Sequence, residues 1–173
     1  GILGYAIPGI IIAIGVLIPA LYLDKWLIEQ GITSKLILNA TLTALIYAYV
    51  VRFLAVAYQP LESSSLKINK SLPDSSNVLG KGNLKTFFKI EFPLIRVGLL
   101  SAFILVFIDI LKELPLTLIM KPYNVNTLAV KAFEYASDEM VSSAALPSLL
   151  IILTALIPAI FLNKLLLKNA SNS

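Results

Sequence analysis

The sequence predicts an all-α polytopic membrane helix bundle, and composition is the first observation that supports this fold class. Apolar residues make up 58% of the 173 residues, charged residues make up 14%, and the mean hydropathy is +0.87. Soluble domains average about a quarter charged residues. The apolar residues are also clustered in long runs that contain prolines. Prolines in membrane helices free backbone groups that neighbouring helices must satisfy, so we expect a packed bundle.

Four segments are long and apolar enough to cross a bilayer, which takes about 20 residues. The four predicted spans cover residues 3–23, 36–58, 94–114 and 141–162.

The distribution of Lys and Arg predicts how these spans are oriented. The stretch over 59–96 carries five lysines and one arginine. Residues 24–35 balance two lysines with two acidic residues, and residues 113–140 carry two lysines against four acidic residues. We therefore expect the connection over 59–93 and the C-terminus on the cytoplasmic side of the membrane. The other two connections are expected on the outer side.

The outward segment over 115–140 has features of its own. Pro115 disfavours helical backbone at Leu114, which predicts a break in the third helix there. The run that follows is apolar enough to re-enter the membrane, where irregular backbone must be lined by protein or by a water-filled cavity. A short interfacial helix is expected next, with Asn126 or Thr127 as its N-cap.

Charged residues inside the predicted spans cost about 2.5–3.5 kcal/mol each on insertion scales. We expect Arg52 and Arg96 to extend to the cytoplasmic headgroups, and for Arg52 a gate or a contact with a partner is the less favoured alternative. In the third span, Asp109, Lys112 and Glu113 have a spacing that makes an ion pair within the helix available. The residues alone leave structural pairing and the lining of a pathway equally open.

The residue types exclude several function classes. Cysteine and histidine are both missing, which excludes disulfides and thiolate or imidazole metal sites and removes the commonest general base. The basic residues form no separate face interleaved with aromatic residues, so no nucleic acid is expected as a partner. No G-x-x-x-x-G-K-[ST] loop is present in the sequence, so any ATP hydrolysis is expected in another subunit. Because the chain begins at Gly1 and runs directly into apolar sequence, we expect it to be part of a longer protein.

The basic connection contains a signature of a short helix, a glycine turn and a second helical piece. Ser71 is a good N-cap, with Pro73 in the first turn, and Gly80 ends the helix. The second piece, NLKTFFKIEF, places apolar residues on one face and lysines on another. On a cytoplasmic surface this is the shape of a docking element.

The connection resembles the cytoplasmic loop of the integral membrane subunits of ABC importers, which has the form E-A-A, three residues, G, nine residues, I-x-L-P. Residues 74–76 (DSS), Gly80 and residues 90–93 (IEFP) fall at those spacings. Asp replaces Glu, Ser-Ser replaces Ala-Ala, and Phe replaces Leu. The resemblance implies that the short helix docks on a cytoplasmic ABC ATPase subunit. The coupling positions that it implies are Asp74, Ser75, Ser76, Leu79, Gly80, Ile90 and Pro93.

Other stretches extend the resemblance to nearly the whole chain. LGYAIPGIIIAIGVLIP, YVVRFLAVAYQPLE, KELPLTLIMKP and NTLAVKAFEYASDE are similar to stretches of ferric-iron importer permeases, most of all to the C-terminal part. This resemblance implies a MetI-like permease fold in a bacterial inner membrane, with no cofactor in this chain. It also implies a periplasmic solute-binding protein and a second permease half, fused or separate, as partners.

Three alternatives remain open at this point. The first is a permease for another small solute, such as molybdate, sulfate, thiamine or a polyamine. The second is an intramembrane enzyme that uses Asp109 and Glu113 as a carboxylate pair. The third is a membrane scaffold that transports nothing.

Overall fold

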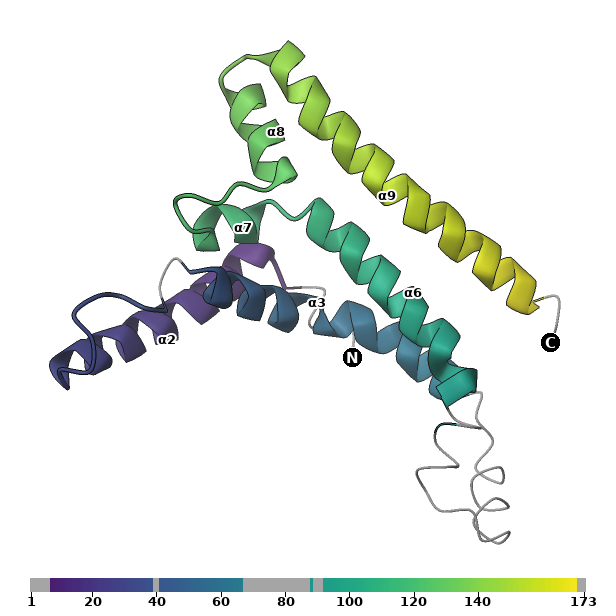
Figure 1. Ribbon diagram of the computed structural model, residues 1–173, viewed down its shortest axis with the longest axis horizontal. Coiled ribbons are helices and arrows are strands. Elements are labelled where there is room, and N and C mark those ends of the chain that lie inside the picture. The colour runs from purple at the N-terminus through teal and green to yellow at the C-terminus, as the bar shows by residue number, and fades with distance from the viewer. Residues whose placement is uncertain (1–6, 39–40, 67–87, 89–91, 171–173) are drawn as a thin grey trace, which may run out of the picture.

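The computed structural model describes residues 7–38, 41–66, 88 and 92–170, and these residues contain helices and no strands (Figure 1). The all-α fold class is therefore confirmed. The helices are α2 (Gly9–Glu29), α3 (Leu42–Ser65), α6 (Phe92–Leu111), α7 (Pro115–Met120), α8 (Leu128–Ser137) and α9 (Val141–Ala170).

Three helices among the described residues are long and apolar enough to cross a membrane. They are α2, α3 and residues 141–167 of α9, and α6 lies over the third predicted span. Only 6% of the apolar part of α9 is buried within the chain. Most of its apolar side chains therefore face outward, as expected for a helix that meets lipid or further protein.

The end of α2 differs from the sequence prediction. The helix continues through Asp24 to Glu29, so residues 24–29 are helical and do not belong to a connection. Gly31 takes a φ of 71°, and the amide of Ile32 donates to the carbonyl of Leu27 at 3.0 Å. This left-handed glycine cap stops the helix. Asp24 itself is fully buried and accepts hydrogen bonds from the amides of Ile37 (3.0 Å) and Leu38 (2.9 Å).

The predicted break before Pro115 is confirmed, but the reason given for it is wrong, because Leu114 keeps a helical conformation with φ of −112° and ψ of −55°. Helix α6 ends at Leu111, and Pro115 is the first residue of α7, where its missing N–H costs no hydrogen bond. Of the two N-caps predicted for the next helix, Thr127 is the one used. Its side chain accepts from the amide of Val130 at 3.3 Å.

Helices α3 and α6 pack side by side, and they are in tight contact at Gly98. A Cβ atom at this position would lie 2.6 Å from the carbonyl oxygen of Pro60 and would overlap the side chain of Ser64. Small residues are what allow membrane helices to approach this closely, because apolar burial alone gives no advantage over lipid. Helix α9 completes the arrangement by packing on α6 and α8.

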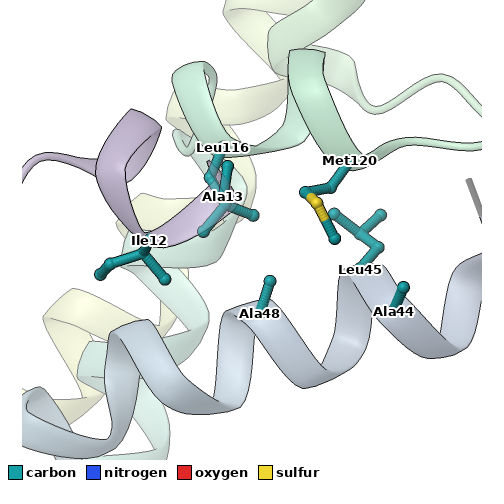
Figure 2. Close-up of a cluster of buried hydrophobic side chains, with 7 residues drawn as sticks. All are labelled: Ile12, Ala13, Ala44, Leu45, Ala48, Leu116 and Met120. Atoms are coloured by element: carbon teal, nitrogen blue, oxygen red, sulfur yellow. The ribbon is translucent and has the colours of Figure 1, made fainter. Parts of the chain in front are cut away.

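The buried core lies where α7 meets α2 and α3 (Figure 2). Alanines on α2 and α3 leave room for Leu116 and Met120, which come from α7 and are the two largest fully buried side chains among the described residues. The cluster consists of Ile12, Ala13, Ala44, Leu45, Ala48, Leu116 and Met120. The short helix after the break therefore contributes one buried face to this cluster, with Leu116, Thr117 and Met120 fully buried.

Candidate functional site

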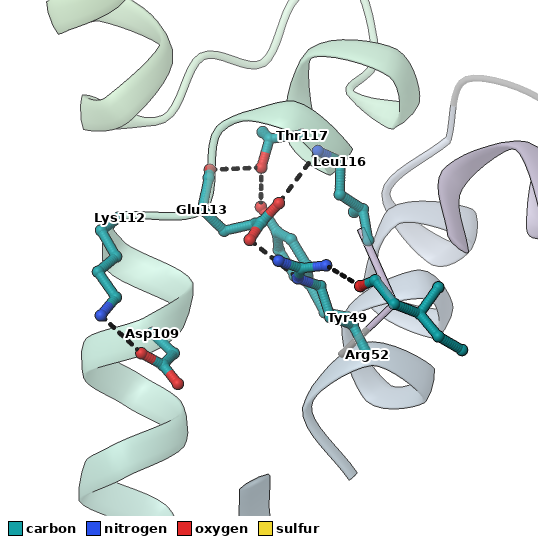
Figure 3. Close-up of polar contacts among 8 residues, drawn as sticks. Tyr49, Arg52, Asp109, Lys112, Glu113, Leu116 and Thr117 are labelled. Carbon is teal, nitrogen blue, oxygen red and sulfur yellow. Dashed lines mark hydrogen bonds and ion pairs between the residues drawn. The ribbon is translucent and has the colours of Figure 1, made fainter. Parts of the chain in front are cut away.

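The junction between α6 and α7 brings two opposite charges together inside the helix bundle. Nε of Arg52 lies 2.9 Å from Oε2 of Glu113, and the two side chains are 21% and 7% exposed (Figure 3). The contact is an ion pair whose N–H is not aligned for a hydrogen bond. The prediction that Arg52 extends to the headgroups is therefore wrong. The physical reason is that a carboxylate at the same depth offsets the cost of the charge better than a long reach to water does.

Glu113 also organises the start of α7. Its Oε1 accepts a hydrogen bond from the amide of Leu116 at 3.1 Å, and its carbonyl accepts one from the hydroxyl of Thr117 at 2.8 Å. The first amides of a helix have no partner within the helix, so a carboxylate at this position satisfies one of them. One side chain thus neutralises Arg52 and fixes the first turn of α7.

Further contacts connect this pair to α2 and α3. The hydroxyl of Tyr49 lies 2.6 Å from that of Thr117, and Nη1 of Arg52 donates to the carbonyl of Ile7 at 3.3 Å. The Arg52 guanidinium also lies 5.6 Å from the ring centroid of Phe53. The pair is therefore held by groups from the chain before α2, from α3 and from α7.

Gly9 lies directly against the ion pair. A Cβ atom there would be 2.8 Å from Oε1 of Glu113 and 2.9 Å from Nη1 of Arg52. Such distances are shorter than van der Waals contact, so any side chain at this position would push on the pair. The first residue of α2 thus fits beside the two charges because it has no side chain.

The other charged residues of the third predicted span form a separate pair. Nζ of Lys112 lies 2.9 Å from Oδ1 of Asp109, one turn apart on the chain. In Figure 3 this pair lies at the end of α6, with Asp109 in its last turn and Lys112 just after it, apart from the contact between Glu113 and Arg52. Asp109 and Glu113 are therefore neutralised by different cations and do not form a carboxylate dyad.

The predicted coupling positions can be placed only in part. Asp74, Ser75, Ser76, Leu79, Gly80 and Ile90 lie outside the described residues. Pro93 is the second residue of α6 and is exposed, as suits a proline in a first helical turn. Within the described residues, no group of three His, Cys, Asp or Glu side chains is placed to hold a metal ion.

Helix α8 carries a charged surface of its own. Nζ of Lys131 lies 2.8 Å from Oε2 of Glu134, and Nζ of Lys121 bonds Oδ1 of Asn126 at 2.7 Å. The hydrogen bond to Lys131 lowers the pKa of Glu134, and the same bond raises the pKa of Lys131. Both groups are exposed to solvent, so this pair adds little to stability.

A large apolar cavity of about 1030 Å³ opens between α3, α6 and α9. Leu61, Phe103 and Leu165 are among the residues that line it, and Arg96 is the charged residue at its wall. The side chain of Arg96 is exposed and has no ion-pair partner among the described residues.

The pairing of Arg52 with Glu113 was not found by sequence reasoning. The sequence contains only a weak signal for this pairing. Arg52 has no acidic residue near it in the second predicted span, and Glu113 stands at the end of the third span without a cation at helical spacing. Local spacing favours Lys112 as a partner for Asp109, whereas the observed partner of Glu113 lies on another helix.

Comparison with known proteins decides the family. The family described as "Binding-protein-dependent transport system inner membrane component" matches residues 1–171. The chain belongs to this family. It is accordingly part of a multi-pass inner membrane protein of a transport system, and the family is neither catalytic nor equipped with a cofactor of its own. The intramembrane enzyme and the scaffold are thereby set aside.

Two curated relatives are distantly similar to the chain. The chain is 26% identical over 160 residues to the Fe(3+)-transport system permease protein FbpB 2 of Haemophilus influenzae, covering 92% of the chain and 29% of that protein. It is 26% identical over 113 residues to the ferric transport system permease protein FbpB of Actinobacillus pleuropneumoniae, covering 64% and 16%. The chain thus spans less than a third of the length of either relative. No solved structure matches it significantly.

Proposed function

We propose that the chain is part of the permease of an ATP-driven, binding-protein-dependent importer and helps to form the translocation pathway for ferric iron. The family supports the transport role, and the observation that carries the ferric-iron assignment is that both matched relatives are named as ferric-iron permeases. The partners in this proposal are cytoplasmic ABC ATPase subunits, a solute-binding protein outside the membrane and a second permease half, fused or separate.

Uptake of labelled ferric iron tests the substrate. A strain that lacks the full-length gene is expected to lose uptake, and a plasmid copy is expected to restore it. Uptake of molybdate, sulfate, thiamine and a polyamine serves as the matched comparison. Unchanged iron uptake, together with loss of one of these other solutes, would contradict the ferric-iron assignment and leave the transport role intact.

Coupling to the ATPase is proposed to run through residues 71–93. The support is the spacing of residues 74–76, Gly80 and residues 90–93, together with the basic character of this connection. In the proposed arrangement, the small residues of the short helix allow close contact with the ATPase subunit.

Substitution of one glycine tests this docking. Gly80→Arg in the full-length protein is expected to abolish copurification of the ATPase subunit, because a long charged side chain would separate the two surfaces. Gly82→Arg is the matched control, because it adds the same side chain two residues further on, at a position that the spacing pattern leaves unspecified. Equal copurification of both variants with the ATPase would contradict the assignment of Gly80.

A further inference from the structure

The ion pair between Arg52 and Glu113 joins the middle of α3 to the junction between α6 and α7. Arg52 is near the middle of α3, which runs from Leu42 to Ser65. At a rise of 1.5 Å per residue, it lies about 15 Å from the start of α3 and about 20 Å from the end. Because Glu113 follows α6 directly, α6 ends beside the middle of α3. Helix α7 covers part of the remaining half.

Helix α7 has little means of holding this place alone. It contains six residues, and isolated helices shorter than about 12 residues are marginal even with favourable sequences. Its first turn is held by Glu113, its hydroxyl at Thr117 contacts Tyr49, and Leu116 and Met120 are fully buried against α2 and α3. The contact at the N-terminal end of α7 therefore includes the ion pair between Glu113 and Arg52.

The ion pair also requires a residue without a side chain at Gly9. The carbonyl of Ile7, just before α2, accepts a hydrogen bond from Arg52, and the missing Cβ atom at Gly9 leaves room for the charged atoms of Arg52 and Glu113 beside the start of α2. The arrangement therefore places Glu113 against both α2 and α3. Polar residues are known to fix register in this way in other helix assemblies, at some cost in stability.

We propose that Arg52, Glu113 and Gly9 are positioning residues that hold α7 against α2 and α3, and that transport requires α7 in this position. In this proposal, Arg52 and Glu113 neutralise each other and do not bind the transported solute. The proposal rests on the transport role of the family, but it does not depend on which solute is carried.

Disulfide formation between α3 and α7 measures the position of α7 directly. Leu45 and Met120 are neighbours in the buried cluster (Figure 2), and these 173 residues contain no cysteine. The full-length protein is made with Leu45→Cys and Met120→Cys, and with any cysteines elsewhere replaced. Oxidation in membrane vesicles then gives the yield of cross-link when α7 is in place.

The decisive variant combines Arg52→Met with Glu113→Gln. Removing both charges leaves no unpaired charge in the membrane, so the protein is expected to accumulate at its normal level. The amide oxygen of Gln can still accept from the amide of Leu116. We expect the cross-link yield and the transport rate to fall together, by at least about fivefold. The matched control, Asp109→Asn with Lys112→Gln, removes the neighbouring ion pair and is expected to change neither.

Three results would overturn the proposal. The first is a double-neutral variant that cross-links and transports at the unmodified level, because α7 would then hold its place without the pair. The second is a loss of transport with an unchanged cross-link yield, because the charges would then act elsewhere, for example on the solute. The third is a double-neutral variant that fails to accumulate, because the pair would then be a requirement of folding. None of these results bears on whether the solute is ferric iron.

Discussion

At the scale of single residues, two glycines of α2 face very different surroundings. A Cβ atom at Gly9 would press on the charged atoms of Arg52 and Glu113, whereas a Cβ atom at Gly15 would meet nothing within 4 Å. Glycine in a helix interior usually costs about 0.5–1 kcal/mol relative to alanine. Gly15 is inside α2 and carries this cost without a close contact, whereas Gly9 is the first residue of the helix and its missing side chain allows close approach to the pair.

The two glycines therefore predict opposite effects of the same substitution. Gly9→Ala is expected to destabilise the full-length protein by about 1–3 kcal/mol, because a well-packed site must rearrange. Gly15→Ala is expected to be neutral or to stabilise by up to about 1 kcal/mol. Thermal denaturation of the purified protein in detergent compares them. Equal shifts of Tm for the two variants would contradict the close contact at Gly9.

Sequence reasoning at this scale succeeded where the chemistry is local. The N-cap at Thr127 and the pair of Asp109 with Lys112 involve residues within four positions of each other, so spacing alone carries the information. Arg52 and Glu113 are far apart in sequence, and their contact depends on where α6 ends relative to α3. That relative depth is a property of packing, and the printed sequence contains no local signal for it.

At the scale of helices, the crossing of α3 and α6 depends on Gly98. A side chain at this position would overlap Ser64 and would lie 2.6 Å from the carbonyl of Pro60, which belongs to the backbone and cannot turn aside. This contact lies in the first half of α6, and the pair of Arg52 with Glu113 lies just beyond the other end of the helix. The two contacts together define how α6 lies along α3.

Substitutions at this crossing provide a graded test. Gly98→Ala is expected to destabilise the protein by at least about 1–3 kcal/mol, since it overfills a tight contact. Adding Ser64→Gly removes one of the two obstacles, and only part of the loss is expected to return because the carbonyl of Pro60 remains. The fraction of the purified protein that stays folded on heating measures both variants. Full recovery in the double variant would show that the Pro60 carbonyl imposes no limit.

The end of α8 offers a substitution with the opposite sign. Glu139 has a φ of 60°, and the amide of Met140 donates to the carbonyl of Tyr135 at 2.9 Å, which is the geometry of a glycine-type helix cap. Left-handed backbone costs a residue with a side chain about 1–2 kcal/mol. Glu139→Gly is therefore expected to raise Tm, and Glu139→Ala, which keeps the strain, is the control. A lower Tm for Glu139→Gly than for Glu139→Ala would contradict this account.

The helices themselves were largely predictable, and their ends were less so. Pro115 marks the break correctly because proline is favoured at the first position of a helix, where its missing N–H costs no hydrogen bond. The sequence prediction misplaces the end of α2, because a charged residue such as Asp24 usually indicates a connection. Its carboxylate is in fact buried and bonded to the amides of Ile37 and Leu38, which makes a charged residue compatible with the apolar helix.

At the scale of the whole molecule, the chain presents large apolar surfaces on several sides. Exposed large side chains occur along α2, α3, α6 and α9. Contiguous apolar surface of this kind indicates contact with lipid or with other protein. The chain covers 29% of one relative and 16% of the other, and the proposed second permease half would provide further protein contacts.

The orientation in the membrane can be tested at two exposed positions. Tyr123 lies between α7 and α8 and is 95% exposed, and Leu66 follows α3 and is 81% exposed. Because the balance of Lys and Arg predicts opposite sides for them, a membrane-impermeant maleimide is expected to label Tyr123→Cys from outside the membrane. Leu66→Cys is expected to react only in inside-out vesicles. The reverse pattern would invert the proposed orientation and place the C-terminus outside.

The distance along the chain between Arg52 and Glu113 also has a consequence for biosynthesis. Ribosomes add about 5–20 residues per second, so α3 enters the membrane several seconds before its carboxylate partner has been made. During that interval the apolar length of α3 alone must compensate for an unneutralised guanidinium, which costs about 2.5–3.5 kcal/mol on insertion scales. Once Glu113 has been synthesised, its attraction to Arg52 favours the packing of α6 against helices that are already inserted. The ion pair thereby gives the assembly of this bundle an order in time.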